Sequence, residues 1–204
     1  MGFYGETVLP RLIHFVLGRR AISRLRSRRL AGVRGVVVEI GFGSGLSLPH
    51  YTPAVTRLIG IDPTRGALRL ARDVLASARF PVALVAASAE HLPLADGSAD
   101  AVVSAFTLCS IPDVDRALAE VGRVLRPGGE LHFVEHGLSD EPRTARWQER
   151  LTPLQRRLAG GCRLDREFGG LARRAGFVLE ELERFRLPGP RILTEIYAGI
   201  ARRP

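Results

Sequence analysis

The chain has 204 residues, of which 46% are hydrophobic and 25% are charged, and its formal net charge is +9. This length suits one α/β domain with a full core, and the ordinary composition excludes disordered, collagen-like and disulfide-stapled proteins. All 30 basic residues are arginine, a bias that an arginine-rich genome explains. Cys109 and Cys162 lack metal-ligand spacing, so we expect a reduced, cytoplasmic protein without a metal.

The charge is unevenly distributed along the chain. Residues 1–35 contain eight arginines and one acidic residue, and residues 143–204 contain fourteen arginines and seven acidic residues. Residues 36–142 are acidic, with thirteen acidic residues and eight arginines. Basic segments attract phosphate groups on nucleic acids, anionic lipids or small substrates. We therefore divide the chain into a basic helical cap over 1–35 and a single domain over 36–204.

Hydrophobic periodicity predicts the elements in chain order. An amphipathic helix over 7–17 and an arginine-rich second helix precede a short buried strand over 36–40. Further buried strands are expected at 57–61, 81–87, 101–106 and 130–135, with helices at 64–78, from Asp113 as N-cap to 125, at 142–158 and at 165–175. Two final strands, 177–187 and 192–201, form an antiparallel edge hairpin around residues 188–190. The alternation predicts a doubly wound, mostly parallel seven-stranded sheet.

A glycine-rich loop follows the first predicted strand. Glu39 is followed by Gly41, Gly43 and Gly45, and glycines there let the backbone turn sharply and approach a ligand closely. Asp62 stands at the end of the second strand, where an acidic side chain can accept both hydroxyls of a ribose. The loop has neither the spacing of dinucleotide enzymes nor a lysine for a nucleoside triphosphate. A phosphate-free nucleoside such as S-adenosylmethionine fits this pattern.

Several strings of the chain resemble the class I S-adenosylmethionine-dependent methyltransferases. They span residues 39–45, 60–62, 89–93, 96–100 and 125–129. Shorter strings at 107–110, 133–136, 147–148 and 161–164 resemble a narrower branch, the methyltransferase-like thiol S-methyltransferases and their bacterial relatives. The resemblance implies a Rossmann-like fold, S-adenosylmethionine as the methyl donor and S-adenosylhomocysteine as the product. It makes 36–204 the methyltransferase domain.

The resemblance also implies positions for the cofactor. Glu39 and the three loop glycines would hold the methionine end, and Asp62 would bind the ribose. The adenine would be contacted by Pro63, Ser88 and Ala89, and the methyl donor by Phe106 and Thr107.

A thiol or phenol acceptor benefits from a nearby base, and four side chains follow the fourth and fifth strands. The catalytic candidates are Cys109, Asp113, Glu135 and His136, of which His136 is favoured as a base. Further candidates for facing the acceptor are Tyr4, His14, His50, Tyr51 and Trp147. The segment 104–107 lacks the motif of adenine N6- and cytosine N4-methyltransferases, which excludes that class.

The leading expectation is a methyltransferase for a small lipophilic acceptor, with thiols first. The alternatives are a phospholipid-amine or quinone-precursor methyltransferase, and a non-catalytic module that binds S-adenosylmethionine or RNA. The basic flanks have few interleaved aromatic residues, which argues against nucleic acid as a partner.

The basic N-terminal helix predicts peripheral contact with an anionic membrane, at the inner surface of a cytoplasmic membrane. No run reaches the ~18 apolar residues of a transmembrane helix. Arginines follow the first apolar run rather than precede it, which argues against a secretory signal.

Overall fold

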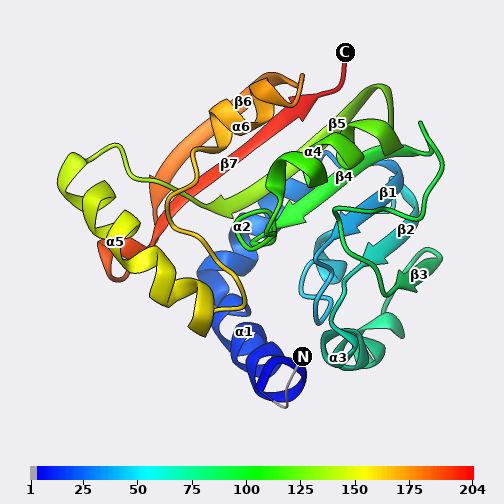
Figure 1. The fold of residues 1–204 in the computed structure, drawn as a ribbon. Helices are drawn as coiled ribbons and strands as arrows, with labels where there is room; N and C mark the ends of the chain where they lie inside the picture. The colour runs from blue at the N-terminus through cyan, green and yellow to red at the C-terminus, as the bar shows by residue number, and fades with distance from the viewer. Residues whose placement is uncertain (1–3) are drawn as a thin grey trace.

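A twisted seven-stranded sheet forms the centre of the computed structural model, which describes residues 4–204 (Figure 1). The strand order is β3-β2-β1-β4-β5-β7-β6. Neighbouring strands from β3 to β5 are parallel, and β7 runs antiparallel to both β5 and β6. The strands are β1 Gly35–Ile40, β2 Val55–Ile61, β3 Val82–Val85, β4 Ala99–Ala105, β5 Leu125–His136, β6 Val178–Arg186 and β7 Glu195–Arg202.

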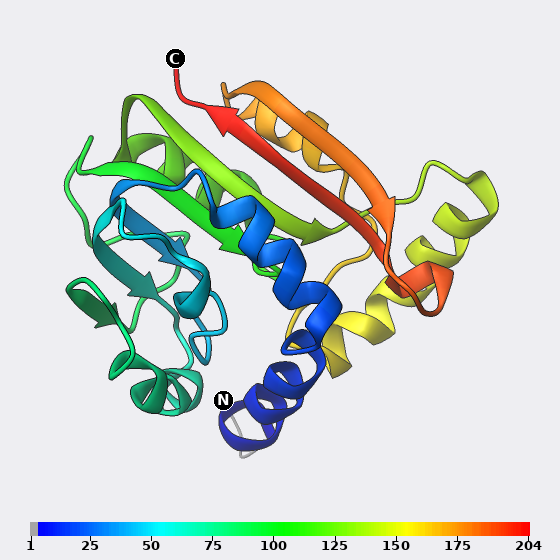
Figure 2. The same ribbon diagram turned by 180° about the vertical axis from the view of Figure 1, so that it is seen from behind.

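Helices cover both faces of this sheet. The face seen in Figure 1 carries α4 and α6, and α2 crosses the opposite face, seen in Figure 2. The α-helices are α1 Leu9–Leu17, α2 Arg20–Leu30, α3 Arg65–Leu75, α4 Val114–Val124, α5 Pro142–Leu158 and α6 Phe168–Arg174. Short helical turns are η1 Tyr4–Val8, η2 Leu48–His50 and η3 Arg191–Leu193.

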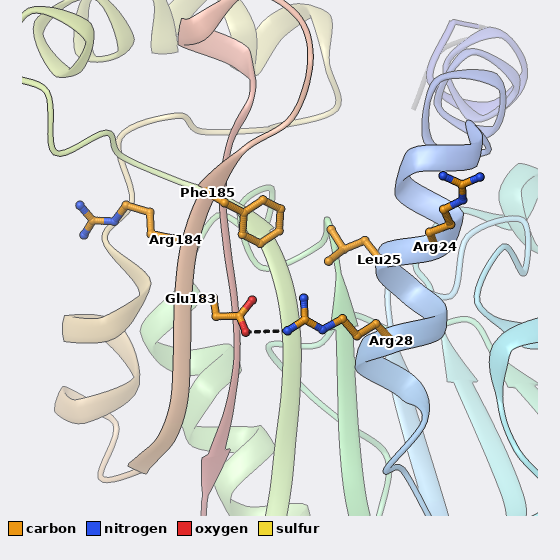
Figure 3. Close-up of a pocket in the computed structure, with 6 residues that line it drawn as sticks. All are labelled: Arg24, Leu25, Arg28, Glu183, Arg184 and Phe185. Atoms are coloured by element: carbon orange, nitrogen blue, oxygen red, sulfur yellow. Dashed lines mark hydrogen bonds and ion pairs between the residues drawn. The ribbon is translucent and has the colours of Figure 1, made fainter.

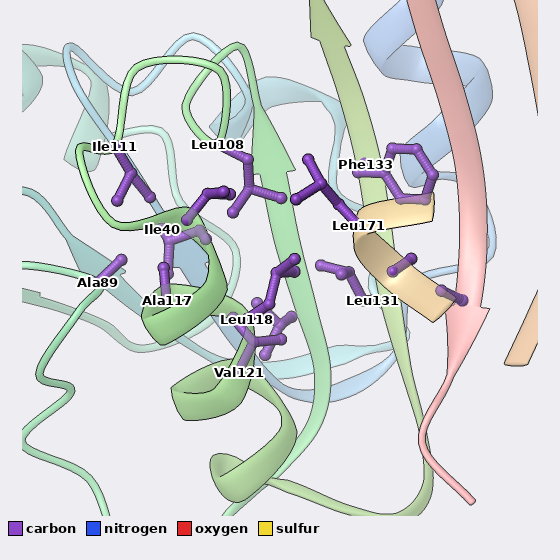
Figure 4. Close-up of a cluster of buried hydrophobic side chains, with 14 of the residues drawn as sticks. Ile40, Ala89, Leu108, Ile111, Ala117, Leu118, Val121, Leu131, Phe133 and Leu171 are labelled. Atoms are coloured by element: carbon purple, nitrogen blue, oxygen red, sulfur yellow. The ribbon is translucent and has the colours of Figure 1, made fainter. Parts of the chain in front are cut away.

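The first strand shows why the buried strands carry apolar residues on both of their faces. Val38 and Ile40 belong to the large hydrophobic cluster that includes Leu118 and Val121 of α4 (Figure 4). Val37, which precedes them, belongs to the cluster on the other face, with side chains from α2 and α3. Successive side chains of a strand point to opposite faces, so a sheet covered on both sides needs apolar residues on both. Glu39, near the end of β1, is the exception.

The topology creates a crevice at the carboxyl ends of β1 and β4. The chain runs outward from β1 to β2 and β3, then crosses back to place β4 on the other side of β1. Connections after β1 and β4 therefore leave the sheet in opposite directions, and ligands of doubly wound folds bind where they separate.

The predicted fold class and the order of elements are confirmed, and the differences concern their ends. The stretch Arg126–Gly129, expected only to end the preceding helix, lies within β5, whose first residue Leu125 pairs with Ala99. The helix expected from 165 begins at Phe168, because Glu167 caps the backbone N–H groups of Gly169 and Gly170. The division at residue 35 stays a prediction.

Candidate active site

A cavity of about 440 Å³ lies at the switch point of the sheet. It falls in the size range of small-molecule sites. The predicted cofactor residues that line it are Glu39, Gly41, Gly43, Asp62, Pro63, Ser88, Ala89, Phe106 and Thr107. Gly45, the remaining predicted position, does not line it. The fold thus brings together nine of the ten predicted residues, which lie at or just after the ends of four strands. Their contacts with a cofactor stay predictions.

The glycine loop needs glycine for two different reasons. Gly41 has φ +70°, and a Cβ built there would overlap the side chain of Thr107, so the loops after β1 and β4 touch. Gly43 has φ +58°, and a Cβ there would have only the Gly41 carbonyl oxygen within 4 Å. The space at Gly43 is therefore open to a ligand, and the left-handed backbone favours glycine at both positions.

Asp62 ties the glycine loop to the end of β2. One carboxylate oxygen accepts the N–H of Gly43 at 2.9 Å, and the other accepts the N–H of Thr64 at 2.8 Å. Burial raises the pKa of Asp62, while these two hydrogen bonds oppose that shift. A carboxylate has about four acceptor sites, so the two oxygens can still accept from a pair of hydroxyls.

Glu39 and Arg26 place opposite charges at the other end of the cavity. Glu39 is 2% exposed, accepts the hydroxyl of Tyr51 at 3.0 Å, and has a pKa raised to about 7 by burial. Arg26 of α2 also lines the cavity; it donates to the Leu17 carbonyl oxygen at 2.7 Å and lies 5.8 Å from the Phe106 ring centroid. Its buried Nε has no hydrogen-bond partner among residues 4–204. The sequence prediction missed Arg26, because an arginine in a basic helix is normally solvated.

One wall of the cavity is the N-terminal helix. Leu9, Pro10, Ile13 and Leu17 of α1 line it. His14 of the same helix hydrogen-bonds through Nδ1 to the Ser44 hydroxyl at 2.7 Å, which fixes α1 against the glycine loop. The predicted amphipathic helix therefore covers the cavity with its apolar face.

Asp113 and Glu135, predicted as candidate bases, both have structural hydrogen-bond partners. Asp113 caps α4 by accepting the N–H of Arg116 at 3.0 Å. Glu135 is fully buried; it accepts the Ser104 hydroxyl at 2.6 Å. Its other donors are the backbone N–H groups of residues 107, 108 and 109. Asp113 thus starts α4, as its predicted N-cap role requires, and Glu135 shapes the loop after β4. A catalytic role for either stays a prediction.

Cys109 and His136 lie just behind the cavity wall, together with Cys162. The two sulfurs are 3.8 Å apart, and His136 Nδ1 lies 3.8 Å from the Cys162 sulfur. The ring of His136 packs on Phe106 with centroids 4.9 Å apart. None of these three lines the cavity, although the neighbouring Ser110 does. A catalytic role for Cys109 or His136 stays a prediction.

The remaining acceptor candidates point elsewhere. Trp147 is half exposed on α5, and His50 hydrogen-bonds to Ser23 and Ser27 of α2. The Tyr4 hydroxyl donates to the Leu158 carbonyl oxygen at 2.8 Å. Tyr51 contacts Glu39 rather than the cavity.

A second hollow of about 520 Å³ lies between α2 and the edge strand β6 (Figure 3). Its lining side chains are Arg24, Leu25, Arg28, Glu183, Arg184 and Phe185. Arg28 and Glu183 form an ion pair across it at 3.1 Å. No predicted site residue lies there.

The donor set of the first cavity fits S-adenosylmethionine. The free acceptor sites of Asp62 suit the ribose hydroxyls, and the apolar Pro63 and Ala89 suit the adenine. Glu39 and the unpaired Nε of Arg26 offer one partner each to the ammonium and carboxylate groups of an amino acid.

Solved structures confirm the fold. A methyltransferase from Thermotoga maritima superposes with a TM-score of 0.71 at 24% identity, covering 98% of both chains. The [4+2]-cyclase SpnF superposes equally well, with a TM-score of 0.71 at 19% identity over 90% of this chain and 81% of its own. Because the second protein is named for a different reaction, fold alone does not decide the chemistry.

Sequence comparison decides the family. A family model described as a methyltransferase domain matches residues 38–133. Human thiol S-methyltransferase TMT1A is 36% identical over 74% of this chain and 64% of its own length, and human TMT1B is 32% identical over 81% and 69%. The C-methyltransferase UbiE of Methylobacterium nodulans is 35% identical over 82% and 63%. The chain spans about two thirds of these relatives and belongs to the S-adenosylmethionine-dependent methyltransferases.

Proposed function

We propose that this methyltransferase transfers the methyl group of S-adenosylmethionine to a small lipophilic thiol. The observation that carries the proposal is the apolar wall of the cavity. Leu9, Ile13 and Leu17 of α1 line the same cavity as the predicted cofactor-binding residues in the loops after β1, β2 and β4. The similarity to TMT1A and TMT1B supports a thiol among lipophilic acceptors.

The chemistry asks the protein mainly for alignment and for exclusion of water. The acceptor sulfur forms a bond to the methyl carbon while the bond from that carbon to the sulfonium sulfur breaks. S-Adenosylhomocysteine leaves with the bonding electron pair, and the thiol proton passes to solvent. Holding two reactants in line can contribute about 7–11 kcal/mol. Closure of the cavity by α1, fixed through the His14–Ser44 hydrogen bond, provides the water-excluding wall.

The test is transfer of a labelled methyl group to a panel of alkyl thiols, quinols and lipid amines. We expect labelled thioethers, with rates that rise with alkyl chain length. Ile13→Ser, which places a hydroxyl on the apolar wall, should raise the KM for the longest thiol more than for the shortest. Labelling of quinols alone would contradict the thiol proposal.

A quinone precursor is the second candidate. It is supported by the 35% identity with UbiE of Methylobacterium nodulans over 82% of this chain. A polyprenylated ring would need the same apolar wall but a carbon nucleophile, so the product would carry a new carbon–carbon bond. Mass spectrometry of the product separates the two candidates.

We also propose that α1 and the end of α5 rest on an anionic membrane surface. Large apolar side chains are exposed there: Tyr4, Val8, Leu12, Phe15 and Val16 on one segment, and Leu154 and Leu158 on the other. The Tyr4–Leu158 hydrogen bond joins the two segments into one surface. Arginines adjoin it, as in Arg19, which lies 5.9 Å from the Phe15 ring centroid. Apolar anchors beside basic side chains suit the headgroup region of a bilayer.

No helix within residues 4–204 has the length and apolar character to span a bilayer. The proposed contact is therefore with the membrane surface. It lies beside the cavity, since Leu9 and Ile13 of α1 line the cavity. A lipophilic acceptor dissolved in the membrane would have a short path to the methyl donor.

A further inference from the structure

Three side chains that are far apart in the sequence meet behind the wall of the cofactor cavity. Cys109 follows β4, His136 ends β5, and Cys162 follows α5. One potential ligand atom from each lies within 4.8 Å of the other two. We propose that this Cys109–His136–Cys162 cluster binds a thiophilic divalent cation, of which Zn²⁺ is the best match.

Two of the three distances between the ligand atoms agree with a shared tetrahedral centre. With Zn–S of about 2.3 Å and Zn–N of about 2.0–2.1 Å, tetrahedral angles place two sulfurs about 3.8 Å apart and a sulfur about 3.6 Å from a nitrogen. The structure has 3.8 Å between the two sulfurs and 3.8 Å between Cys162 Sγ and His136 Nδ1. The Cys109 sulfur and the His136 ring nitrogen lie within 4.8 Å of each other, so a shared centre requires this pair to approach by about 1 Å at most.

The charge of the cluster also favours a dication. Two thiolates and a neutral imidazole bring two negative charges, which Zn²⁺ cancels, so the loaded site is neutral and suited to burial. Cys109 and Cys162 are both buried. Two further charges near the cluster are Glu135, which is negative, and Arg166, which is positive. Both form hydrogen bonds with backbone groups of the loop after β4.

The surroundings hold the ligands in place before any cation arrives. The backbone N–H of Cys109 donates to Glu135 at 3.1 Å, and the N–H of Arg163 donates to the Cys109 carbonyl oxygen at 2.8 Å. The second bond joins the two cysteine-bearing loops directly. Outer contacts of this kind orient metal ligands and strengthen binding.

The location gives the cation a positioning role. Ser110 and Gly161, which adjoin the two cysteines, line the cofactor cavity, and so does Phe106, on which His136 packs. A cation at the cluster would fix the loop after β4 and the loop after α5 relative to each other. Three protein ligands leave the fourth tetrahedral position for water.

The test is metal content and affinity in the reduced full-length chain. We expect about one zinc per chain after dialysis against zinc and removal of the excess, since residues 4–204 hold one such cluster. Cobalt(II) in its place should give the intense visible bands of a tetrahedral site and a thiolate charge-transfer band. Zinc should also raise the melting temperature.

Variants locate the site. His136→Gln and Cys162→Ser should each weaken zinc binding by at least about 100-fold, because even outer partners contribute 10–100-fold. His91→Gln is the matched control, since His91 lies at the surface beside Arg116. A melting-temperature rise with S-adenosylhomocysteine shows that a variant is folded.

Three results would overturn the proposal. They are a reduced wild-type chain that takes up no zinc, equal loss of affinity in His91→Gln, and folded His136→Gln and Cys162→Ser variants that bind zinc as the wild type does. Because the readout is metal binding, it does not depend on which acceptor is methylated.

Discussion

Tyr51 donates its hydroxyl to a carboxylate oxygen of Glu39 over 3.0 Å, with both side chains buried where the glycine loop begins. Burial raises the pKa of Glu39 to about 7, although hydrogen bonds from Ser47 and Tyr51 and the charge of Arg26 oppose the shift. Near neutral pH this carboxyl group is therefore close to the midpoint of its titration. A cationic ligand group at this end of the cavity would favour the charged form.

The first prediction concerns stability and pH. The folded chain keeps the Glu39 proton up to about pH 7, whereas the unfolded chain releases it near the ordinary value of 4.5. The contribution of this group to stability is thus full below pH 4.5 and falls as pH rises to 7, by about 3 kcal/mol. Glu39→Gln should remove that fall. Urea unfolding at pH 5 and pH 8 measures it.

The control for this prediction is Glu149→Gln, which changes an exposed carboxyl of α5. It should leave the difference between the two pH values unchanged. A Glu39→Gln variant with the same pH dependence as the wild type would show that the buried carboxyl is charged throughout.

The second prediction concerns cofactor binding through Asp62. S-Adenosylhomocysteine should raise the melting temperature of the wild type, and Asp62→Ala should remove most of that rise. Two charge-assisted hydrogen bonds to a ribose contribute about 3 kcal/mol or more together, so affinity should fall at least ~100-fold. Titration calorimetry gives the affinity.

Asp115→Ala is the matched control for Asp62→Ala. Asp115 is exposed on α4 and forms an ion pair with Arg174 at 3.8 Å. If the two variants bound the cofactor equally well, Asp62 would have no part in the site.

The glycine loop and Asp62 could be predicted from the sequence because each depends on a local pattern: a buried strand followed by a particular turn. Arg26 could not be predicted in this way. It stands 13 residues before Glu39 in the sequence, and only the crossing of α2 over the sheet brings it to the cavity. The Cys109–His136–Cys162 cluster has no recognisable spacing, since its members meet only through three separate strand and helix ends. Glu135 was predicted at the correct place, but position at a strand end does not show which donors surround a carboxylate.

The third prediction separates the two roles of Glu135. Glu135→Gln replaces one acceptor oxygen by an amide group that faces backbone N–H donors, and leaves buried donors unsatisfied. Each such donor costs about 1–3 kcal/mol, so unfolding free energy should fall by about 3 kcal/mol. Urea denaturation measures it, with Glu149→Gln as the exposed control. Unchanged stability with lost turnover would instead restore Glu135 as a catalytic base.

The fourth prediction tests the membrane surface. Deleting the N-terminal helices would also remove Ile22 and Leu30 of α2, which are buried, so point substitutions are the better test. Leu12→Ser with Phe15→Ser changes only exposed side chains of α1, of which Phe15 is 69% exposed. Burying each apolar side chain contributes about 1.5–3 kcal/mol, so the double variant should bind anionic vesicles at least about 100-fold more weakly.

Flotation with phosphatidylglycerol vesicles is the measurement, and binding should weaken with salt because arginines contribute. Val178→Ser, at a similarly exposed position on the edge strand β6, is the control and should float as the wild type does. Wild-type chains that stay unbound at low salt would remove the membrane from the proposal. Equal binding by the double variant and the wild type would place the contact on another face.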